Sequence, residues 1–404
     1  MNGGMKLKYR IRITPKNPFV IGGKKLNNDY IKSLDHIPGG VLRAALSREI
    51  VMACPYYNQN SSKKYWVEYK NEKECTSCRY KNLCKNFSEI KIGELYPQNS
   101  KNYPLTAMRC KENSEHKAFD TLSEKLIRKI YKDDKNLNQI DSGCPECKKR
   151  VERCSGLFLE ENGIQKDVEV VNFLVTKNAI NPYMRTAKDG ILYTLDAGST
   201  KVMVGDEEKD LYFEGIIEGD GIKSELEDID SLYIGAYNTA GFGKFVIDVV
   251  DKYEEDDIKS LENRIQKFNI KINSEKKIYV PITLESDTYI NLPIENDKKL
   301  CEISKDEYIK IYENSLKEIS ELGKIFYINF LSDTRRGFDT SKENVKFRKA
   351  KKVIKSGGVI VLEIDKDKID YSKLLNIQNN GIGENTIHGF GKIKICDEFH
   401  LNSR

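Results

Sequence analysis

The chain contains two glycine-rich loops of one pattern, and this repeat constrains its fold more than any other feature. The loops span residues 233–245 and 381–393. Both carry Gly-x5-Gly-Phe-Gly-Lys before an alternation of apolar and polar residues that is typical of a β-strand. Because glycine has no Cβ, such a loop can adopt positive φ and bring main-chain N–H groups close to a phosphate. A match of this length predicts two related modules, each binding the backbone of a nucleic acid.

The composition agrees with a multidomain protein that permits a polyanionic partner without requiring one. At 404 residues the chain is long for one domain, and two or three are expected. Its net charge is only +5, but residues 335–355 contain nine Lys or Arg and two acidic residues. Such a segment either contacts a polyanion or forms a solvated face, and both interpretations stay open at this point.

The distribution of apolar residues predicts a cytoplasmic protein with no membrane partner. No apolar stretch approaches the roughly 20 residues that a membrane-spanning helix needs. The first residues lack the apolar core of a signal peptide. Disulfides are rare in the cytoplasm, so the ten cysteines are expected to be thiols or metal ligands.

Residues 1–251 are expected to form the first module. Residues 6–14 alternate as a strand does, and a Pro-Gly-Gly sequence at 38–40 opens a helix predicted over 41–51. The N-terminus of that helix presents free N–H groups and is therefore a candidate anion site. Arg43, on its first turn, would add a charged donor.

The remaining sequence predicts a linker and a second module. Residues 252–276 are charged and are expected to form a linking helix, and residues 277–404 alternate strand and helix patterns in the order β-α-β-β-α-β. That order predicts an α+β fold made of two ferredoxin-like (RRM-like) modules. In the first module, residues 192–194 and 211–217 are expected to pair as a long hairpin.

Residues 52–158 differ from the rest of the first module, because they hold eight of the ten cysteines and show little periodicity. Cys-x2-Cys pairs at 75–78 and 144–147 place two thiolates on one tight turn, as tetrahedral zinc requires. We therefore expect a Cys-rich, zinc-binding insertion with one or two structural sites. The candidate ligands are Cys54, Cys75, Cys78 and Cys84 for one site and Cys110, His116, Cys144, Cys147 and Cys154 for the other.

Two alternatives to zinc stay open. An iron–sulfur cluster is also held by cysteine thiolates, and reduced cysteines can serve as small apolar core residues. Cys301 and Cys396 lie outside the insertion and are expected to be inert.

Several motifs, in order along the chain, resemble the RAMP superfamily of CRISPR systems. They are the first strand with the Phe-Val-Ile-Gly-Gly after it, the Pro-Gly-Gly helix start, the stretch 185–193 and the two Gly-Phe-Gly loops. The chain is most similar to the large two-RAMP subunit of type III-D effector complexes. That family shows a Pro-Leu-Thr-Ala-x-x-Cys-Lys like the one at 104–111 and a Phe-His like the one at 399–400. His116 and the Asp-Thr-Leu at 120–122 extend the match.

This resemblance implies an RNA-binding structural subunit of a type III effector complex in antiviral defence. Its partners would be the guide crRNA, gripped at the 5′ region, the target RNA paired with that guide, and other subunits of the complex. Residues 185–217 would form a thumb-like hairpin that presses on the guide. Main-chain and Lys or Arg contacts suit guides of varied sequence. The residues expected at the RNA are Gly39, Gly40, Arg43, Arg185, Gly235, Gly241, Gly243, Lys244, Arg335, Arg336, Gly383, His388, Gly389, Gly391 and Lys392.

The sequence favours binding over catalysis, and no catalytic residue is assigned. In related filament subunits an aspartate before the Pro-Gly helix cleaves target RNA, and Asp29 and Asp35 occupy that stretch here. Stand-alone processing nucleases of the same fold use a histidine as acid or base, for which His36 is the main candidate. An endoribonuclease is therefore the alternative function. A zinc-stabilised protein adaptor is a third class, which the duplicated loops and the basic segment disfavour.

Overall fold

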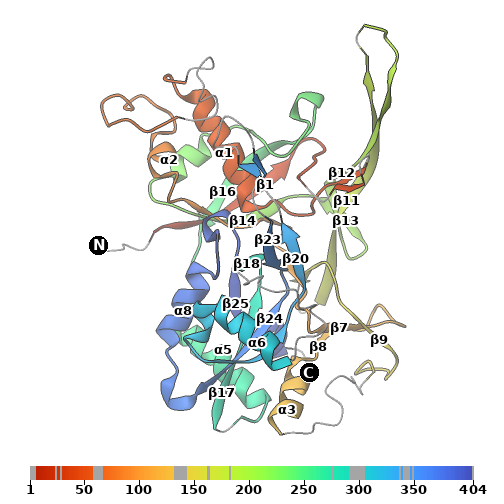
Figure 1. Ribbon diagram of the computed structural model, residues 1–404, viewed down its shortest axis with the longest axis vertical. Helices are drawn as coiled ribbons and strands as arrows, with labels where there is room; N and C mark the ends of the chain where they lie inside the picture. Colours follow the sequence, from red (N-terminus) through yellow and green to blue (C-terminus); the bar gives the residue numbers. More distant parts are fainter. Residues whose placement is uncertain are drawn as a thin grey trace. The chain divides into compact units, whose positions relative to one another are not determined.

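The computed structural model of the chain (Figure 1) divides into two compact units. Unit 1 comprises Met1–Ser100, Lys166–Glu254 and Ile387–Gly389, and unit 2 comprises Lys101–Gln165, Glu255–Thr386 and Phe390–Arg404. The Cys-rich stretch expected within the first module is therefore shared, since Lys101–Gln165 packs in unit 2. The structure describes all residues except 1–5, 23–24, 28–29, 58–66, 132–142, 162–163, 182, 275, 291–304, 336–337, 340–345, 348–349 and 403–404.

Unit 1 is built on an antiparallel sheet with β1 at its centre. β1 (Lys8–Pro15) pairs on one side with β14 (Phe213–Glu218) and on the other with β16 (Lys244–Lys252). The full order is β15-β16-β1-β14-β4, and β5 also pairs with β14. Alternate residues of β1 are buried, as the sequence pattern predicts, and Ile11 and Ile13 are fully enclosed. The short strands are β4 (Lys91–Ile92), β5 (Tyr96–Pro97) and β15 (Leu232–Tyr233).

Three helices of unit 1 lie near this sheet. α1 (Gly39–Ala53) follows the Pro-Gly-Gly start, as predicted, and contacts β4 and β15 with its buried apolar side chains. α2 (Lys81–Asn86) and α4 (Lys223–Glu227) are joined by Glu225, whose carboxylate accepts hydrogen bonds from two backbone amides at the start of α2, at 2.8 and 2.7 Å. These bonds fix the first part of the Cys-rich stretch to the core of unit 1.

A long two-stranded hairpin is formed by β11 (Ile164–Ile180) and β12 (Ala187–Val204), which belong to a different sheet from β1 (Figure 1). This corrects the predicted pairing of residues 192–194 with 211–217. Residues 213–217 of the second stretch lie instead in β14 beside β1, where their apolar side chains contribute to the core. Phe213 and Ile217 are fully buried there. β3 (Tyr30–Lys32) and β13 (Glu207–Asp210) pair with β12, and β2 (Lys25–Asn27) pairs with β3.

Unit 2 is built on a second antiparallel sheet, in the order β19-β24-β17-β25. β17 (Lys277–Leu284) lies between β24 (Val359–Asp365) and β25 (Ile393–Ile395), and β19 (Lys324–Asn329) pairs with the far side of β24. Its central strands are buried along most of their length, which requires cover on both faces. The helices of unit 2 outside the Cys-rich stretch are α5 (Ile258–Lys271), α6 (Lys305–Ser315), α7 (Lys317–Ser320), α8 (Tyr371–Asn380) and α9 (Glu398–Asn402).

The core of unit 2 includes a helix from the Cys-rich stretch. Leu122 and Leu126 of α3 (Leu122–Ile130) belong to the same buried cluster as Val280 of β17 and Val361 of β24. The second part of that stretch is therefore integral to unit 2. The smaller strands of this unit are β6 (Lys101–Asn102), β7 (Ala107–Cys110), β8 (Phe119–Asp120), β9 (Val151–Arg153), β10 (Leu157–Glu161), β18 (Thr288–Ile290), β20 (Ser332–Arg335), β21 (Phe338–Asp339), β22 (Lys346–Phe347) and β23 (Lys351–Ile354).

The two main sheets share one strand order. Among the four matched strands of each sheet, taken along the chain, the first lies between the third and the fourth, and the second lies at an edge. The orders are β16-β1-β14-β4 in unit 1 and β25-β17-β24-β19 in unit 2. The predicted α+β class, with antiparallel sheets, is confirmed. Within the described parts of the chain, no helix has both the length and the apolarity needed to cross a bilayer.

A buried ion pair joins α9, the last helix of unit 2, to β8, and a hydrogen bond from the same histidine reaches β17. Nδ1 of His400 lies 2.7 Å from the Asp120 carboxylate, and Nε2 lies 2.8 Å from the Thr283 hydroxyl. Both charged side chains are fully buried. Burial disfavours the charged imidazole, but the carboxylate of Asp120 outweighs it and raises the pKa of His400. The order Asp-His-Thr is that of a hydrolase triad, but complete burial keeps a substrate away, so we interpret the contact as structural.

Asp120→Asn is expected to lower the free energy of unfolding by about 3–5 kcal/mol, because it leaves a buried imidazole without its counter-charge. Urea denaturation followed by circular dichroism measures this loss. Asp210→Asn removes an exposed ion pair with Lys201 and is the matched control, in which little change is expected. Equal losses in the two variants would contradict the structural role of the buried pair.

The same pair predicts a pH window of maximal stabilisation. Because the pKa of His400 is raised, its contribution is complete below the ordinary value of 6.5 and is lost as the pH rises through the raised value. Burial alone would raise the pKa of Asp120, but His400 lowers it, so this contribution is complete above 3.8 and is lost as the pH falls through the lowered value.

The stability difference between the native chain and Asp120→Asn should therefore be largest between pH 3.8 and 6.5 and should decline toward alkaline pH. Urea titrations at a series of pH values measure it. A difference that grows toward alkaline pH would show that the pair is not ionised in the folded protein.

Candidate nucleic-acid interface and metal site

The two glycine loops have the same main-chain structure, held by equivalent hydrogen bonds. In each loop, the last glycine donates to one carbonyl, and the residue after the first glycine donates to the carbonyl two residues further along. These bonds are Gly243 to Pro18 (2.8 Å) and Ala236 to Val20 (2.8 Å) in the first loop, and Gly391 to Asp287 (2.9 Å) and Glu384 to Tyr289 (3.3 Å) in the second. The repeat in the sequence is therefore also a repeat in three dimensions.

Four matched positions in each loop have positive φ, and three of the four are glycines. The paired values are +90° and +73° for Gly235 and Gly383, +62° and +63° for Tyr237 and Asn385, +85° and +91° for Gly241 and Gly389, and +75° and +73° for Gly243 and Gly391. A Cβ at Gly235 or at Gly383 would also lie 2.4 Å from a carbonyl oxygen of the segment that follows the first strand of its sheet. Glycine is thus required there both by φ and by close approach.

Because of these internal contacts, only part of each glycine loop is accessible to a ligand. The amides of Gly243 and Gly391 already donate inside the protein. The exposed part of the first loop is its tip at Ala236 and 239–241, followed by the partly buried Lys244. In the second loop, Lys392 is exposed and lies 2.9 Å from a glutamate of the same unit. The tips and the lysines are therefore the accessible parts of the two loops, while His388 and Gly389 are grouped with unit 1.

The start of α1 is closed by neighbouring main chain. A Cβ on Gly39 would lie 2.2 Å from a carbonyl oxygen of β4, so no larger residue fits, and Gly40 beside it is partly buried. Arg43 donates to the carbonyl oxygens of Ile90, at 2.6 Å, and of Phe87, whose ring centroid lies 4.4 Å from the guanidinium. Burial lowers the pKa of Arg43. This side chain ties α1 to the segment before β4.

The described catalytic candidates contact each other. Nδ1 of His36 lies 2.9 Å from the Asp35 carboxylate, and the His36 ring stacks on Tyr96 with centroids 5.5 Å apart. Burial opposes ionisation of Asp35, but the hydrogen bond with His36 prevails and lowers its pKa. Asp29 lies outside the described residues. A histidine engaged by a carboxylate and an aromatic ring is held in place before α1.

The described part of the basic segment is partly neutralised by one buried aspartate. The carboxylate of Asp287 lies 2.5 Å from Nη2 of Arg335 and 2.7 Å from Nζ of Lys355. The guanidinium of Arg335 also lies 5.6 Å from the ring centroid of Phe390, in the Gly-Phe-Gly of the second loop. Arg336 lies outside the described residues. The basic segment is thus attached to the second loop, through the same aspartate whose carbonyl accepts from that loop.

Arg185 lies at the turn of the long hairpin, between β11 and β12. Its φ is +55°, and its amide donates to the carbonyl of Asn181 at 2.9 Å, which closes the turn. The side chain is exposed, and so are those of Tyr183 and Met184, of which 95% and 71% are accessible. The turn therefore presents a cation and two large apolar side chains to solvent.

Four candidate ligands of the second Cys group meet at one point. The ligand atoms of Cys110, His116, Cys144 and Cys147 all lie within 4.8 Å of one another. Nδ1 of His116 is 3.1 Å from Sγ of Cys144, and Sγ of Cys110 is 3.6 Å from Sγ of Cys147. The group could therefore hold a metal ion. Three sulfurs and one imidazole are a ligand set of structural zinc that leaves no position for water.

The Cys-x2-Cys turn of this group is organised to hold a thiolate. Burial raises the pKa of Cys144, but the backbone amides of Cys147 and Glu146 and the His116 ring outweigh it, so that the pKa is about 7. Lys148 adopts a φ of +58°, and its amide donates to the Cys144 carbonyl at 2.7 Å, which closes the turn. Hydrogen bonds of this kind orient metal ligands.

Burial distinguishes the remaining cysteines. Cys154, which the spacing offers as a fourth ligand, is buried in an apolar cluster with Tyr103 and Phe158 and is not among the four grouped ligands. Cys396 is fully enclosed, and burial strongly raises the pKa of its thiol, as an inert cysteine requires. Cys301 lies outside the described residues.

The first Cys group belongs to unit 1, and among the described residues its sulfurs are not grouped as closely as the ligand atoms of the second set. Burial, followed by repulsion from Cys78, Cys54 and Cys75, raises the pKa of Cys84 to about 11. A bound cation would reverse the shift, because it favours the thiolate form of every ligand. This set stays a predicted second metal site.

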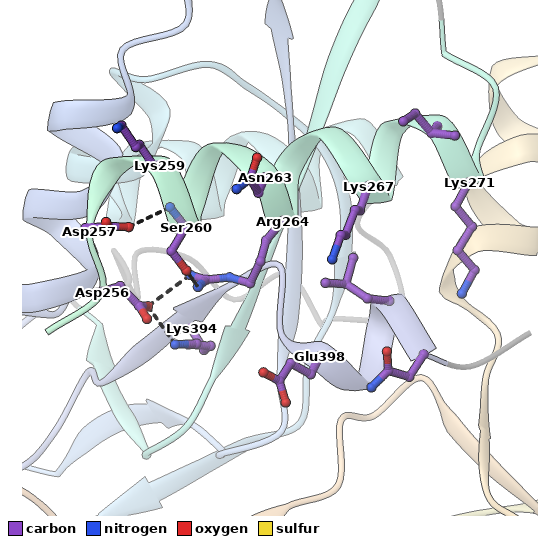
Figure 2. A pocket seen from close by; sticks show the side chains of 13 residues that line it. Asp256, Asp257, Lys259, Ser260, Asn263, Arg264, Lys267, Lys271, Lys394 and Glu398 are labelled. Atoms are coloured by element: carbon purple, nitrogen blue, oxygen red, sulfur yellow. Dashed lines mark hydrogen bonds and ion pairs between the residues drawn. The ribbon is translucent and has the colours of Figure 1, made fainter. Parts of the chain in front are cut away.

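Unit 2 also carries a polar groove along α5 (Figure 2). The cavity has a volume of about 1030 Å³, and its walls present both signs of charge. Asp256 lies 3.0 Å from Arg264 and 2.7 Å from Lys394. Burial opposes its ionisation, but these two cations prevail and lower the pKa of Asp256 to about 2. Asp256 thus pairs with two cations of the groove. The groove therefore does not present a purely positive surface to an anion.

Cys144→Ser combined with Cys147→Ser is expected to release about one metal equivalent per chain and to lower the midpoint of thermal unfolding, because a structural metal stabilises the fold that binds it. Mass spectrometry of the metal content, with thermal melting, measures both effects in the full chain. Cys154→Ala is the matched control and should keep its metal. Full metal retention in the double variant would remove this site.

Comparison with known proteins finds no protein-family model that matches the chain and no curated protein that matches its sequence. Among solved structures, a chain in the cryo-EM structure of the type III-B Cmr-beta bound to cognate target RNA is similar over 92% of this chain and 96% of its own, with a TM-score of 0.42 and 14% identity. A chain of the same assembly with target RNA and AMPPnP, in state 1, gives 0.39 and 14% over 92% and 88% of the two chains. A chain of its apo state gives 0.30 and 10% over 60% and 97%. Likenesses of this size assign neither a family nor a function.

Proposed function

We propose that this chain is an RNA-binding structural subunit of a type III CRISPR effector complex, similar to the large two-RAMP subunit of type III-D, that grips the 5′ region of the guide crRNA. Its partners are then the crRNA, the target RNA paired with it and neighbouring subunits, in the cytoplasm. The observation that carries the proposal is the duplicated glycine loop. It has matched φ values and matched main-chain bonds beside two sheets of one strand order.

Two ferredoxin-like (RRM-like) modules are part of this proposal. The chain order β-α-β-β-α-β characterises this fold. In the first module, residues 1–251, β1, α1, β4, β14, α4 and β16 follow that order. In the second, residues 277–404, β17, α6, β19, β24, α8 and β25 do so, after a linker at 252–276 that contains α5. Sheets of this kind are a common platform for single-stranded RNA.

In each unit, the proposed contact surface for RNA consists of the accessible loop tip and nearby cations. Lys244 and Lys392 occupy equivalent positions directly after Gly-Phe-Gly; Lys244 begins β16, and Lys392 directly precedes β25. Arg185 lies at the exposed turn of the long hairpin, and we propose this hairpin, formed by β11 and β12, as the thumb-like element. Contacts from lysine, arginine and main chain read no base identity, so they suit a subunit that handles varied guides.

The metal and catalytic assignments follow from the site geometry. Structural zinc is proposed at Cys110, His116, Cys144 and Cys147, which are grouped in space. A second zinc is proposed at Cys54, Cys75, Cys78 and Cys84 from the spacing of these cysteines in the sequence. No catalytic step is assigned. The endoribonuclease alternative would require Asp35 or His36 to act on RNA, and these two side chains engage each other at 2.9 Å.

Lys244→Ala and Lys392→Ala are each expected to weaken binding of a repeat-derived RNA and to reduce the slope of log K against log salt by about 0.7, since each loses about one phosphate contact. Fluorescence anisotropy at several salt concentrations measures both quantities. Lys366→Ala, an exposed lysine outside the loops, is the control and should bind as the native chain does. Unchanged affinity and slope in both loop variants would remove these residues from the interface.

The same RNA-binding assays distinguish the RNA scaffold, the endoribonuclease and the protein adaptor. RNA recovered intact after salt-sensitive binding supports the scaffold. Cleavage of the RNA by the purified chain, run on a denaturing gel, would instead support the endoribonuclease. Absence of both binding and cleavage would support the protein adaptor and overturn the proposed function.

A further inference from the structure

The two glycine loops share their main chain but differ at one position with positive φ. Tyr237 has a φ of +62°, and its counterpart Asn385 has a φ of +63°. Asparagine tolerates this left-handed region, whereas a bulky aromatic residue rarely adopts it. The second loop shows that the fold of the loop does not need an aromatic side chain here. The strained tyrosine in the first loop therefore needs another explanation.

The ring of Tyr237 belongs to a cluster of aromatic and cationic side chains. It stacks on Tyr193 with centroids 6.1 Å apart and planes 23° apart, and its centroid lies 6.5 Å from that of Phe242. Nζ of Lys177 lies 5.4 Å from the centroid of Tyr237 and 4.7 Å from that of Phe242. Lys177 and Tyr193 are directly opposite each other in the register of β11 and β12. The cluster thus joins the first loop to the two strands of the long hairpin.

The surroundings place this cluster at the surface of unit 1. Tyr193 and Tyr237 are partly buried and pack against the apolar cluster of Val20 and Leu195. Ala236 and residues 239–241 beside them are exposed. Burial, together with the Tyr193 hydroxyl, raises the pKa of Tyr237, so the ring stays neutral at physiological pH. Two stacked rings thus lie next to one cation.

An arrangement of this kind is suited to an unpaired nucleobase. Bases stack on aromatic rings without regard to sequence, and a nearby lysine neutralises the adjoining phosphate. The rings are too close together to admit a base between them, because their centroids are only 6.1 Å apart. A base would therefore stack on the outer face of the pair. Fixing both rings before binding reduces the conformational entropy lost by the protein.

We propose that Tyr237, Tyr193 and Lys177 form a stacking site for an unpaired base of single-stranded RNA. This inference rests on the proposed function, and it names a contact to a base where the glycine loops and lysines provide contacts to the backbone. The site belongs to the first loop, while Asn385 leaves the matched position of the second loop without a ring. The two modules then hold RNA in different ways.

The decisive variant is Tyr237→Asn, because it copies the residue that the second loop carries at the same φ. It removes the ring and keeps a residue that the left-handed region accepts, so the thermal midpoint should not fall. Binding of a single-stranded oligouridine RNA, measured by fluorescence anisotropy with the full chain, should weaken about 5- to 150-fold, the range that loss of one base–aromatic stack produces. The slope against salt should not change, since no charge is lost.

Tyr237→Phe is the matched control and should bind as the native chain does, because it keeps the ring and loses only the hydroxyl. A second readout uses oligouridine with one 5-iodouridine. Irradiation should crosslink it to Tyr237 or Tyr193, identified by mass spectrometry, and the crosslink at position 237 should disappear in Tyr237→Asn.

The outcomes separate the two proposals. If the native chain binds RNA and Tyr237→Asn binds equally well, the stacking site is overturned and the proposed function stands. If Tyr237→Asn lowers the thermal midpoint and leaves RNA affinity unchanged, the ring serves packing only. If the native chain shows no salt-dependent RNA binding at all, the proposed function itself fails.

Discussion

Contact between main chains at the glycines of the two loops is the interaction on which the rest of the structure depends. Gly243 donates to the Pro18 carbonyl and Gly391 to the Asp287 carbonyl, and a Cβ at Gly235 or at Gly383 would lie 2.4 Å from a carbonyl oxygen of the same segments. Each contact holds the segment after the first strand of a sheet against the loop that precedes the last strand. These strands therefore pair side by side, β1 with β16 and β17 with β25. A side chain at these glycines would separate the strands on which each unit is built.

Features that depend on a few neighbouring residues could be predicted from the sequence. Three examples are the alternating burial of β1, the Pro-Gly-Gly start of α1 and the Cys-x2-Cys turn. Each depends only on residues that are close in sequence. The partner of a strand could not be predicted in the same way. Residues 211–217 alternate as a hairpin strand would, and only the complete burial of Phe213 separates a core strand from an exposed one. The choice of Cys110 over Cys154 as a ligand likewise depends on where the strands around them lie.

Polar contacts between residues far apart in the chain could not be predicted from the sequence either. Arg43 lies on the first turn of a helix, where a cation favours bound anions, but it uses its donors on the carbonyl oxygens of Ile90 and Phe87. The role of an arginine depends on which acceptors lie within reach of its five N–H groups, and composition does not record that. His400 and Asp120, 280 residues apart, form their ion pair for the same reason. The role of each charged side chain therefore depends on its neighbours in space.

A duplicated main chain with diverged side chains lets the two loops act differently. Glycines and main-chain bonds maintain the shared conformation, so a side chain at the tip can change without loss of the fold. In unit 1 the loop is attached to the hairpin through rings and Lys177. In unit 2 it is attached to the basic segment through Asp287, which binds Arg335 and Lys355. One loop is thus suited to a base and the other lies beside a concentration of charge. Under the proposed function, a chain with a net charge of only +5 holds a polyanion in this way, because the local arrangement of cations, not their sum, determines the field at each loop.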